Sequence, residues 1–377
     1  MMRNKNIEAL RGAAILMLLF YHYSVSLGYF KTPFFVMLDE TICQFSMIIF
    51  FVISGFGTYL HYKRSEIDQV SITYGAYVKQ RFKKIAPAYY FCMIFILLFT
   101  TGGGYLSANG LKAILIYGTF TQNLFPSVSG DINGVMWTIA LFMQFYLISY
   151  PLYRAIEKWG IRIYPFFVIF SIICSKILCS FVAANSYPDM YYVIASIRQI
   201  FTTIDIFVLG MITSRFLNKK KLRFFTDRTG TSVSILIMAA SVLLFIICSF
   251  KIGALWGNGI KYYLWKPAVA IVIAVIIIII SPLTFKYDTL LGRTIQFVSK
   301  VEYNTYLWHM VLFQNIKNTS YGFNAIAEKY PLLTIMFMML LAVLVGYVST
   351  LLTESPNYKM LFTGRSPSHG CRKIREK

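Results

Sequence analysis

The sequence predicts an all-α, polytopic membrane protein with about ten transmembrane helices and both termini in the cytoplasm. Of its 377 residues, 57% are hydrophobic and only 14% are charged, and its mean hydropathy is +0.62. A soluble domain carries about 25% charged residues. The composition therefore excludes an ordinary soluble domain, and two further observations, apolar stretches of spanning length and an uneven distribution of lysine and arginine, give the topology.

Ten stretches are long and apolar enough to cross a bilayer, which takes about 20 residues in a helix. A further segment, 107–125, is shorter and is interrupted by Gly118, Gln122 and Asn123, so we interpret it as an interfacial or re-entrant helix. The ten predicted spans are 8–28, 40–61, 84–101, 135–154, 162–183, 192–216, 231–250, 262–281, 292–317 and 331–353.

The basic residues alternate between the two sides of the predicted membrane. With the N-terminus in the cytoplasm, 26 of the 36 Lys and Arg fall in cytoplasmic segments and only 6 in external ones. Basic residues accumulate on the cytoplasmic side of membrane proteins. The formal net charge of +21 is thus explained by loops that contact anionic lipid, and no nucleic-acid partner is expected.

The chain is expected to form one membrane-embedded domain, residues 1–360, followed by a basic and disordered cytoplasmic tail, residues 361–377. Its six cysteines have no CxxC or other metal-ligand spacing, and five lie in apolar segments. We therefore expect neither a disulfide framework nor a metal site.

Arg11 and His22 occupy the same face of the first predicted span. Eleven residues at about 100° each return a helix to within about 20° of its starting direction, about 16 Å further along. Ionisable side chains at such depths are costly and usually functional. The simpler interpretation makes Arg11 a side chain that reaches back to the membrane surface and His22 a satisfied interior histidine.

A second basic element, Lys79-Gln80-Arg81-Phe82-Lys83-Lys84, precedes the third span on the cytoplasmic side. Together with Arg11 it has the chemistry to bind a phosphorylated cofactor, although basic residues there also serve as topology determinants. In the second span, Ser54 and Gly55 are small residues of the kind that permit close helix packing, and a nucleophilic Ser54 is the alternative.

Further polar residues interrupt the later spans. Trp137 opens the fourth span, and Arg198 and Asp205 lie seven residues apart on the sixth, where mutual neutralisation is the favoured interpretation. His309, in the ninth span, lies at a predicted depth similar to that of His22. One sequence does not identify which helices are neighbours, so contact between the two histidines stays open.

Taken together and in the order in which they occur along the chain, the sequence motifs resemble those of the acyltransferase-three family of integral membrane O-acyltransferases. The likeness runs through nearly the whole chain, and each motif is weak alone. The first motif is Arg11-Gly12 followed by His22, with ten residues between the arginine and the histidine. The others are Phe50-Phe51-Val52-Ile53-Ser54-Gly55-Phe56, Arg81 and Lys84 before Ile85-Ala86-Pro87, Trp137-Thr138 through Phe145-Tyr146 and Pro151, Asp205-Ile206-Phe207-Val208-Leu209-Gly210, Tyr303-Asn304-Thr305-Tyr306-Leu307-Trp308-His309, and Glu354-Ser355-Pro356.

The resemblance implies a cytoplasmic acyl-CoA donor, usually acetyl-CoA, and a hydroxyl of a cell-envelope glycan or glycolipid as acceptor. It implies a protein of the bacterial cytoplasmic membrane that needs no metal, and leaves a homo-oligomer open. Arg11, Arg81 and Lys84 would bind the donor's phosphates, and His22 would be catalytic, either as a general base or as an acyl-accepting relay.

Other roles follow from the same resemblance. Trp137, Tyr303 and His309 are expected to bind substrate on the acceptor side, and Ser54, Gly55, Asp205 and Glu354 to be structural. Many family members carry a glutamate five residues after the tryptophan, where this chain has Phe142. An acidic partner for His22 is therefore expected to be absent or supplied elsewhere.

Two other classes of protein fit less well. A transporter or flippase of lipid-linked saccharides is the alternative, but it leaves the Arg11–His22 register unexplained. A polysaccharide polymerase is expected to have functional arginines in a large external loop, and the largest one here, about 102–134, carries only Lys112.

Overall fold

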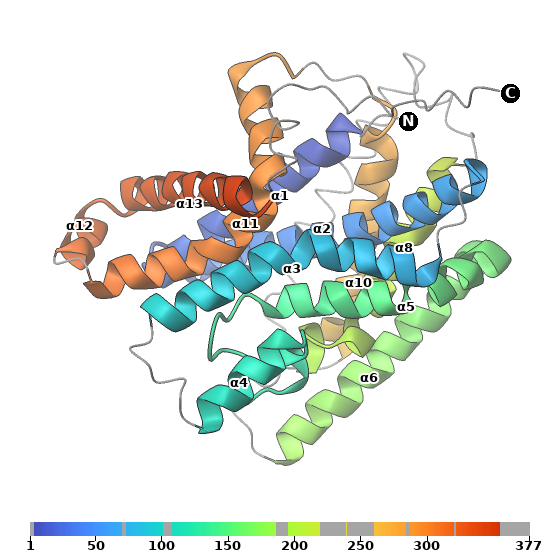
Figure 1. The fold of residues 1–377 in the computed structure, drawn as a ribbon, viewed down its shortest axis with the longest axis horizontal. Helices are drawn as coiled ribbons and strands as arrows, with labels where there is room; N and C mark the ends of the chain where they lie inside the picture. Colours follow the sequence, from blue (N-terminus) through green and yellow to red (C-terminus); the bar gives the residue numbers. More distant parts are fainter. Residues whose placement is uncertain are drawn as a thin grey trace, which may run out of the picture.

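The computed structural model describes residues 4–69, 73–100, 108–185, 195–218, 239, 260–283, 287–319 and 322–354 (Figure 1). Throughout these ranges the regular structure is helical, in agreement with the predicted all-α class. The helices are α1 Lys5–Ser26, α2 Pro33–Ile67, α3 Tyr74–Phe99, α4 Ala108–Gly118, η2 Gln122–Leu124, α5 Trp137–Trp159, η3 Gly160–Ile163, α6 Tyr164–Ala184, α8 Ile200–Asn218, α10 Ile260–Ile280, α11 Leu290–Thr319, α12 Phe323–Lys329 and α13 Pro331–Thr353.

Six helical segments in the described ranges are long and apolar enough to cross a membrane. One of them, Trp137–Ala184, contains both α5 and α6, joined by the short η3 turn. The chain is thus an integral membrane protein, and the count of ten spans stays a prediction. The predicted span 231–250 lies outside the described residues except for Ala239, as does the tail 361–377.

The segment 107–125 contains α4, an 11-residue helix, and the one-turn η2. A helix of this length is about 16 Å long, roughly half the hydrocarbon thickness of a bilayer. It is too short to span, as expected from the polar residues that interrupt the segment.

Local signals in the sequence set several helix ends. The side chain of Asn4 accepts hydrogen bonds from the backbone N–H groups of Asn6 and Ile7, so α1 begins directly after it. Helix α5 begins at Trp137, as predicted, and ends at Trp159, directly before Gly160, whose φ of 64° is easily adopted by glycine.

Helices α1 and α11 run side by side in the same direction. Near their N-terminal ends, a Cβ on Gly12 would meet the carbonyl oxygen of Ile295. Near their C-terminal ends, Tyr23 donates to the carbonyl of His309 (3.1 Å) and its ring stacks on Phe313, with centroids 5.4 Å apart. This parallel alignment agrees with the topology predicted for the first and ninth spans.

Helices α2 and α8 pack through two glycines and form the most extensive helix contact in the described residues. A Cβ on Gly55 would meet the carbonyl of Phe207, and a Cβ on Gly210 would meet the carbonyl of Val52. The absence of these side chains lets the two backbones approach closely.

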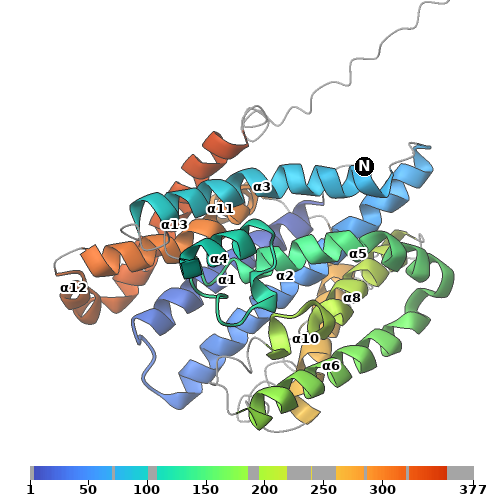
Figure 2. The same ribbon diagram turned by 60° about the horizontal axis from the view of Figure 1, so that its bottom comes forward.

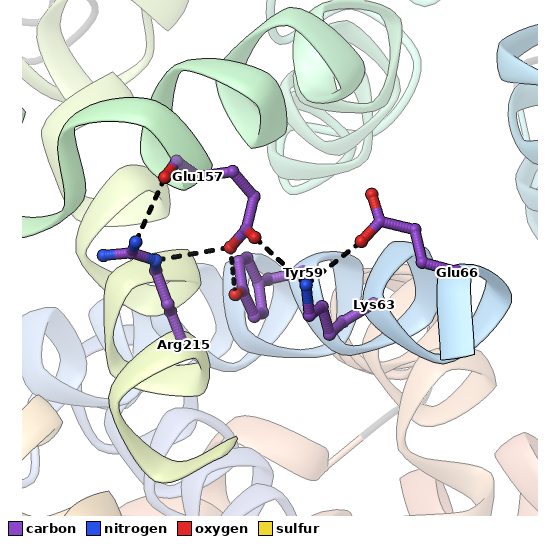
Figure 3. Close-up of polar contacts among 5 residues, drawn as sticks. All are labelled: Tyr59, Lys63, Glu66, Glu157 and Arg215. Carbon is purple, nitrogen blue, oxygen red and sulfur yellow. Dashed lines mark hydrogen bonds and ion pairs between the residues drawn. The ribbon is translucent and has the colours of Figure 1, made fainter. Parts of the chain in front are cut away.

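A cluster around Glu157 joins the ends of α2, α5 and α8 (Figure 3). The Glu157 carboxylate accepts from the Tyr59 hydroxyl (2.5 Å), Lys63 Nζ (3.1 Å) and Arg215 Nε (3.3 Å), and Lys63 also contacts Glu66 (3.1 Å). One carboxylate therefore fixes the relative positions of three helices.

The helices fall into two groups on opposite sides of the bundle. Figures 1 and 2 show α11, α12 and α13 grouped at one side of the bundle and α5 and α6 at the other. Helix α1 contacts both α2 and α11, so it lies between these two helices. Side chains of α1 can therefore contribute to a site that α2 and α11 also line.

We expect Gly55→Ala to lower the free energy of unfolding by about 1–3 kcal/mol, because the added methyl group overpacks the α2–α8 contact. Gly57→Ala is the matched control, since a Cβ there meets nothing within 4 Å. Both substitutions gain similar helix propensity. Thermal unfolding of the purified proteins in detergent measures the difference, and equal stability of the two variants would contradict the packing argument.

Candidate functional site

A cavity of about 810 Å³ lies among α1, α2, α3, α5 and α11, and it also touches the last turn of α8 and residues next to α10 and α13. This volume is within the range of small-molecule and cofactor sites, about 300–1,000 Å³. Along α1 it extends from Asn4 to Leu18, which corresponds to about 21 Å of helix. The cavity is thus suited to an elongated ligand.

One end of the cavity is rich in positive charge. Asn4, Arg64 and Ser281, which lie at helix ends on the side predicted to be cytoplasmic, belong to its lining. Five basic side chains and three carboxylates line the whole cavity. They are Arg11, Arg64, Arg81, Lys84, Lys300, Glu8, Glu302 and Glu354.

The fold therefore brings together Arg11, Arg81 and Lys84, the three residues predicted from the sequence to bind the donor. They come from α1 and α3, which are separated by the whole of α2 in the chain. Arg64 and Lys300 line the same cavity and were not singled out from the sequence. Arg64 lies in a segment rich in basic residues, which gave no reason to choose it, and Lys300 lies within the ninth predicted span, outside its motif.

Arg11 forms an ion pair with Glu302 of α11. The Glu302 side chain is 7% exposed and the Arg11 side chain 28%. A carboxylate so deeply buried is strongly destabilising without a cationic partner. Arg11 therefore has a structural partner in addition to any ligand it contacts in the cavity.

Arg81 is held over two aromatic rings. Its guanidinium lies 4.9 Å from the ring centroid of Tyr77 and 5.3 Å from that of Tyr146. The Tyr146 hydroxyl lies 3.1 Å from Ser54 Oγ, and both residues line the cavity. Such cation–π contacts orient the planar guanidinium, which binds phosphate in a bidentate manner.

His22 lies beyond the other end of the cavity. Leu18, one helical turn earlier, belongs to the lining, whereas His22 does not. Its ring is 5.1 Å from that of His309, centroid to centroid. The two histidines predicted to lie at similar depth are thus neighbours.

The tautomer of His309 follows from its hydrogen bond. Its Nδ1 lies 2.6 Å from the carbonyl oxygen of Tyr306, which can only accept, so Nδ1 carries the proton. Nε2 then has a free lone pair, and it is buried with no hydrogen-bond partner in the described structure. His309 therefore presents a hydrogen-bond acceptor inside the protein, close to His22.

The other predicted substrate-binding residues lie in different places. Tyr303 lines the basic cavity, where its hydroxyl donates to the carbonyl of Ile85 (2.8 Å). Trp137 lies outside the lining, with its ring under the guanidinium of Arg198 at 5.2 Å.

Phe142 stands at the position where many family members carry a glutamate, and it makes an aromatic contact. Phe142 lines the cavity and packs against Phe51, with centroids 5.2 Å apart. Another carboxylate, Asp39 of α2, is 2% exposed and accepts a hydrogen bond from Ser24, two residues after His22. Sequence reasoning missed Asp39, which precedes the second predicted span.

The expectation that Arg198 and Asp205 neutralise each other was wrong. Asp205 Oδ1 accepts from Ser171 (2.8 Å), and the charge acting on it comes from the buried Lys266. Arg198 instead stacks on Trp137. Seven residues put two side chains near the same helix face, but here the chain leaves the regular helix at Arg198 and Gln199 before α8 begins.

The two remaining motif residues pack between helices. Gly55 makes the close α2–α8 contact, and Glu354 accepts from Asn304 Nδ2 of α11 at 3.4 Å. Asn304 in turn accepts from Ser349 of α13 (2.6 Å). Within the described ranges, no three His, Cys, Asp or Glu residues are grouped as metal ligands would be.

Comparison with known protein families gives one match. A family model described as an acyltransferase domain, that of the acyltransferase-3 family, matches residues 4–353. No curated protein and no solved structure matches the chain.

We expect Arg11→Ala to lower the free energy of unfolding by about 3 kcal/mol, because it leaves the buried Glu302 carboxylate unpaired. Glu302→Gln should cost less, since the Arg11 side chain is partly exposed. The double variant Arg11→Ala/Glu302→Gln should recover part of the loss. Thermal unfolding without ligand measures all three, and a double variant no more stable than Arg11→Ala would rule out the ion pair as the cause.

Proposed function

The chain belongs to the acyltransferase-3 family and is a membrane acyltransferase, and from that premise we propose an acyl-CoA-dependent O-acyltransferase. The proposed donor is acetyl-CoA, bound from the cytoplasm. The proposed acceptor is a hydroxyl group of a cell-envelope polysaccharide or of its lipid-linked precursor, in the bacterial cytoplasmic membrane. The observation that carries the proposal is a basic cavity whose apolar end lies one helical turn from His22.

The shape and charge of the cavity support a coenzyme A thioester as donor. Its basic end, with Arg81 and Lys84, suits the phosphate groups, which bind best to Arg and Lys side chains. Its length along α1 leaves room for an extended arm that ends near Leu18. The thioester carbon would then lie next to His22, about 16 Å along the helix from Arg11.

The proposed chemistry uses His22 as a general base. His22 takes the proton from the acceptor hydroxyl as its oxygen forms a bond to the thioester carbon, and the resulting tetrahedral intermediate carries its negative charge on the former carbonyl oxygen. The carbon–sulfur bond then breaks, and the thiolate takes the proton from the imidazolium to give free CoA and the ester. In the relay alternative, the imidazole first accepts the acyl group and then passes it to the hydroxyl.

The acceptor side is proposed to lie at the opposite end from the phosphates. His309, beside His22, and Trp137, under Arg198, are the predicted substrate-binding residues at that end. Tyr303 lines the basic cavity, so we assign its substrate contact to the donor.

We expect His22→Ala to retain acetyl-CoA binding but to lose acyl transfer, together with the slow hydrolysis of acetyl-CoA that the wild type should show without acceptor. Isothermal titration calorimetry and release of free thiol, both on detergent-purified protein, measure the two properties. Hydrolysis at the wild-type rate by His22→Ala would remove His22 from the chemistry. A folded wild type that binds no acetyl-CoA would contradict the proposed function itself.

We expect Lys84→Ala to weaken acetyl-CoA binding up to about tenfold, because a charge-assisted contact to phosphate is lost. Lys83→Ala is the matched control, since Lys83 is an exposed neighbour outside the cavity lining. The difference should shrink as ionic strength rises. Titrations at low and high salt measure it, and equal affinities for the two variants would place the phosphates elsewhere.

A further inference from the structure

Arg198 lies beside the proposed reaction centre, although the sequence had assigned it to a different partner. Its guanidinium is 5.2 Å from the centroid of the Trp137 ring. Thr138, the next residue, donates to the Tyr306 hydroxyl (2.8 Å), and the Tyr306 ring lies 5.5 Å from that of His309, the neighbour of His22. Its Nε is buried and has no hydrogen-bond partner among the described residues. In the part of the chain that the structure describes, no carboxylate lies within ion-pairing distance of it.

The backbone around Arg198 is fixed on both sides. Lys266 Nζ, on α10, donates to the carbonyls of Ser196 (2.6 Å) and Thr202 (2.5 Å). Asn123 Nδ2 donates to the carbonyl of Arg198 itself (3.0 Å), and Gln199 Nε2 donates to the carbonyl of Asn123 (2.5 Å). The cation is thus held in place before any substrate binds, which is the condition for effective electrostatic catalysis.

A cation at this place can stabilise one of the two opposite charges that develop in the transfer step. When His22 takes a proton, positive charge develops on the imidazole and negative charge on the former carbonyl oxygen of the donor. A carboxylate near the histidine would stabilise the first charge, but the family's glutamate position holds Phe142, which packs on Phe51. A guanidinium stabilises the second charge instead.

We propose that Arg198 is a catalytic residue of the acyl transfer, whose guanidinium N–H groups bind the oxyanion of the tetrahedral intermediate formed beside His22. The inference rests on the proposed function. Arg198 exchanges no proton and forms no covalent bond in this step. The oxyanion reverts to a carbonyl when the carbon–sulfur bond breaks and the thiolate leaves.

Hydrolysis of acetyl-CoA without any glycan separates this role from recognition of an anionic acceptor. The same oxyanion forms when water attacks the thioester, but no acceptor is present to be recognised. We expect Arg198→Gln to lower the hydrolysis rate about 10²- to 10³-fold, the usual cost of losing one oxyanion donor, with an unchanged Kd for acetyl-CoA. Added guanidinium should restore part of the rate in Arg198→Ala.

Arg215→Gln is the matched control, because it makes the same substitution on α8, which begins two residues after Arg198, in the Glu157 cluster (Figure 3). Arg215 is separated from the start of α8 by about 22 Å of helix. We expect its hydrolysis rate to equal that of the wild type.

The outcomes are distinct. Hydrolysis by Arg198→Gln at the wild-type rate would overturn the inference while leaving the proposed function intact. Slow hydrolysis without any rescue by guanidinium would also overturn it, because a purely structural loss predicts that result. If Arg198→Gln does not bind acetyl-CoA, the hydrolysis rate of Arg198→Lys provides the test. A rate equal to that of the wild type would overturn the proposed role of the guanidinium N–H groups, because lysine has no planar guanidinium. Failure of the wild type to bind acetyl-CoA would instead contradict the proposed function.

Discussion

The parallel pairing of α1 with α11 is the constraint on which the site depends. Arg11 and Glu302 are each costly in an apolar helix, and their ion pair offsets the cost for both. Once that pair fixes the two helices at one end, their common direction brings His22 next to His309 at the other. A single helix contact thus connects the basic cavity to the proposed reaction centre.

The charges of the site are mainly positive. Five basic side chains and three carboxylates line the cavity, and Arg198 lies outside the lining, over the Trp137 ring. This balance suits a ligand with phosphates at one end and a reaction that develops negative charge at the other. Phe142 replaces the family's glutamate, which would stabilise the imidazolium. The transfer step is instead proposed to be stabilised at the oxyanion, by Arg198.

Features that depend on a single segment could be predicted from the sequence. The apolar stretches located most described helices, the polar interruptions in 107–125 indicated a helix too short to span, and Trp137 begins α5 as expected. Helical periodicity also placed Arg11 and His22 on one face. The family resemblance grouped Arg81 and Lys84 with Arg11, and the fold places all three at one cavity.

Features that depend on helix neighbours could not be predicted in this way. Periodicity shows which face of a helix is polar but not which helix covers it, so the partner of Arg11 was not identified. The same limit led to the wrong pairing of Arg198 with Asp205, because Ser171, the hydrogen-bond partner of Asp205, and the buried Lys266 lie on other helices, α6 and α10. A break in the helix at Arg198 and Gln199 then turned Arg198 toward Trp137.

A cryo-electron microscopy structure of the purified protein with CoA bound would show directly whether the cavity is the donor site. We expect the phosphate groups beside Arg81 and Lys84, and the thiol at the Leu18 end of the cavity, within reach of His22. CoA bound elsewhere, or bound with its thiol directed away from His22, would contradict that assignment.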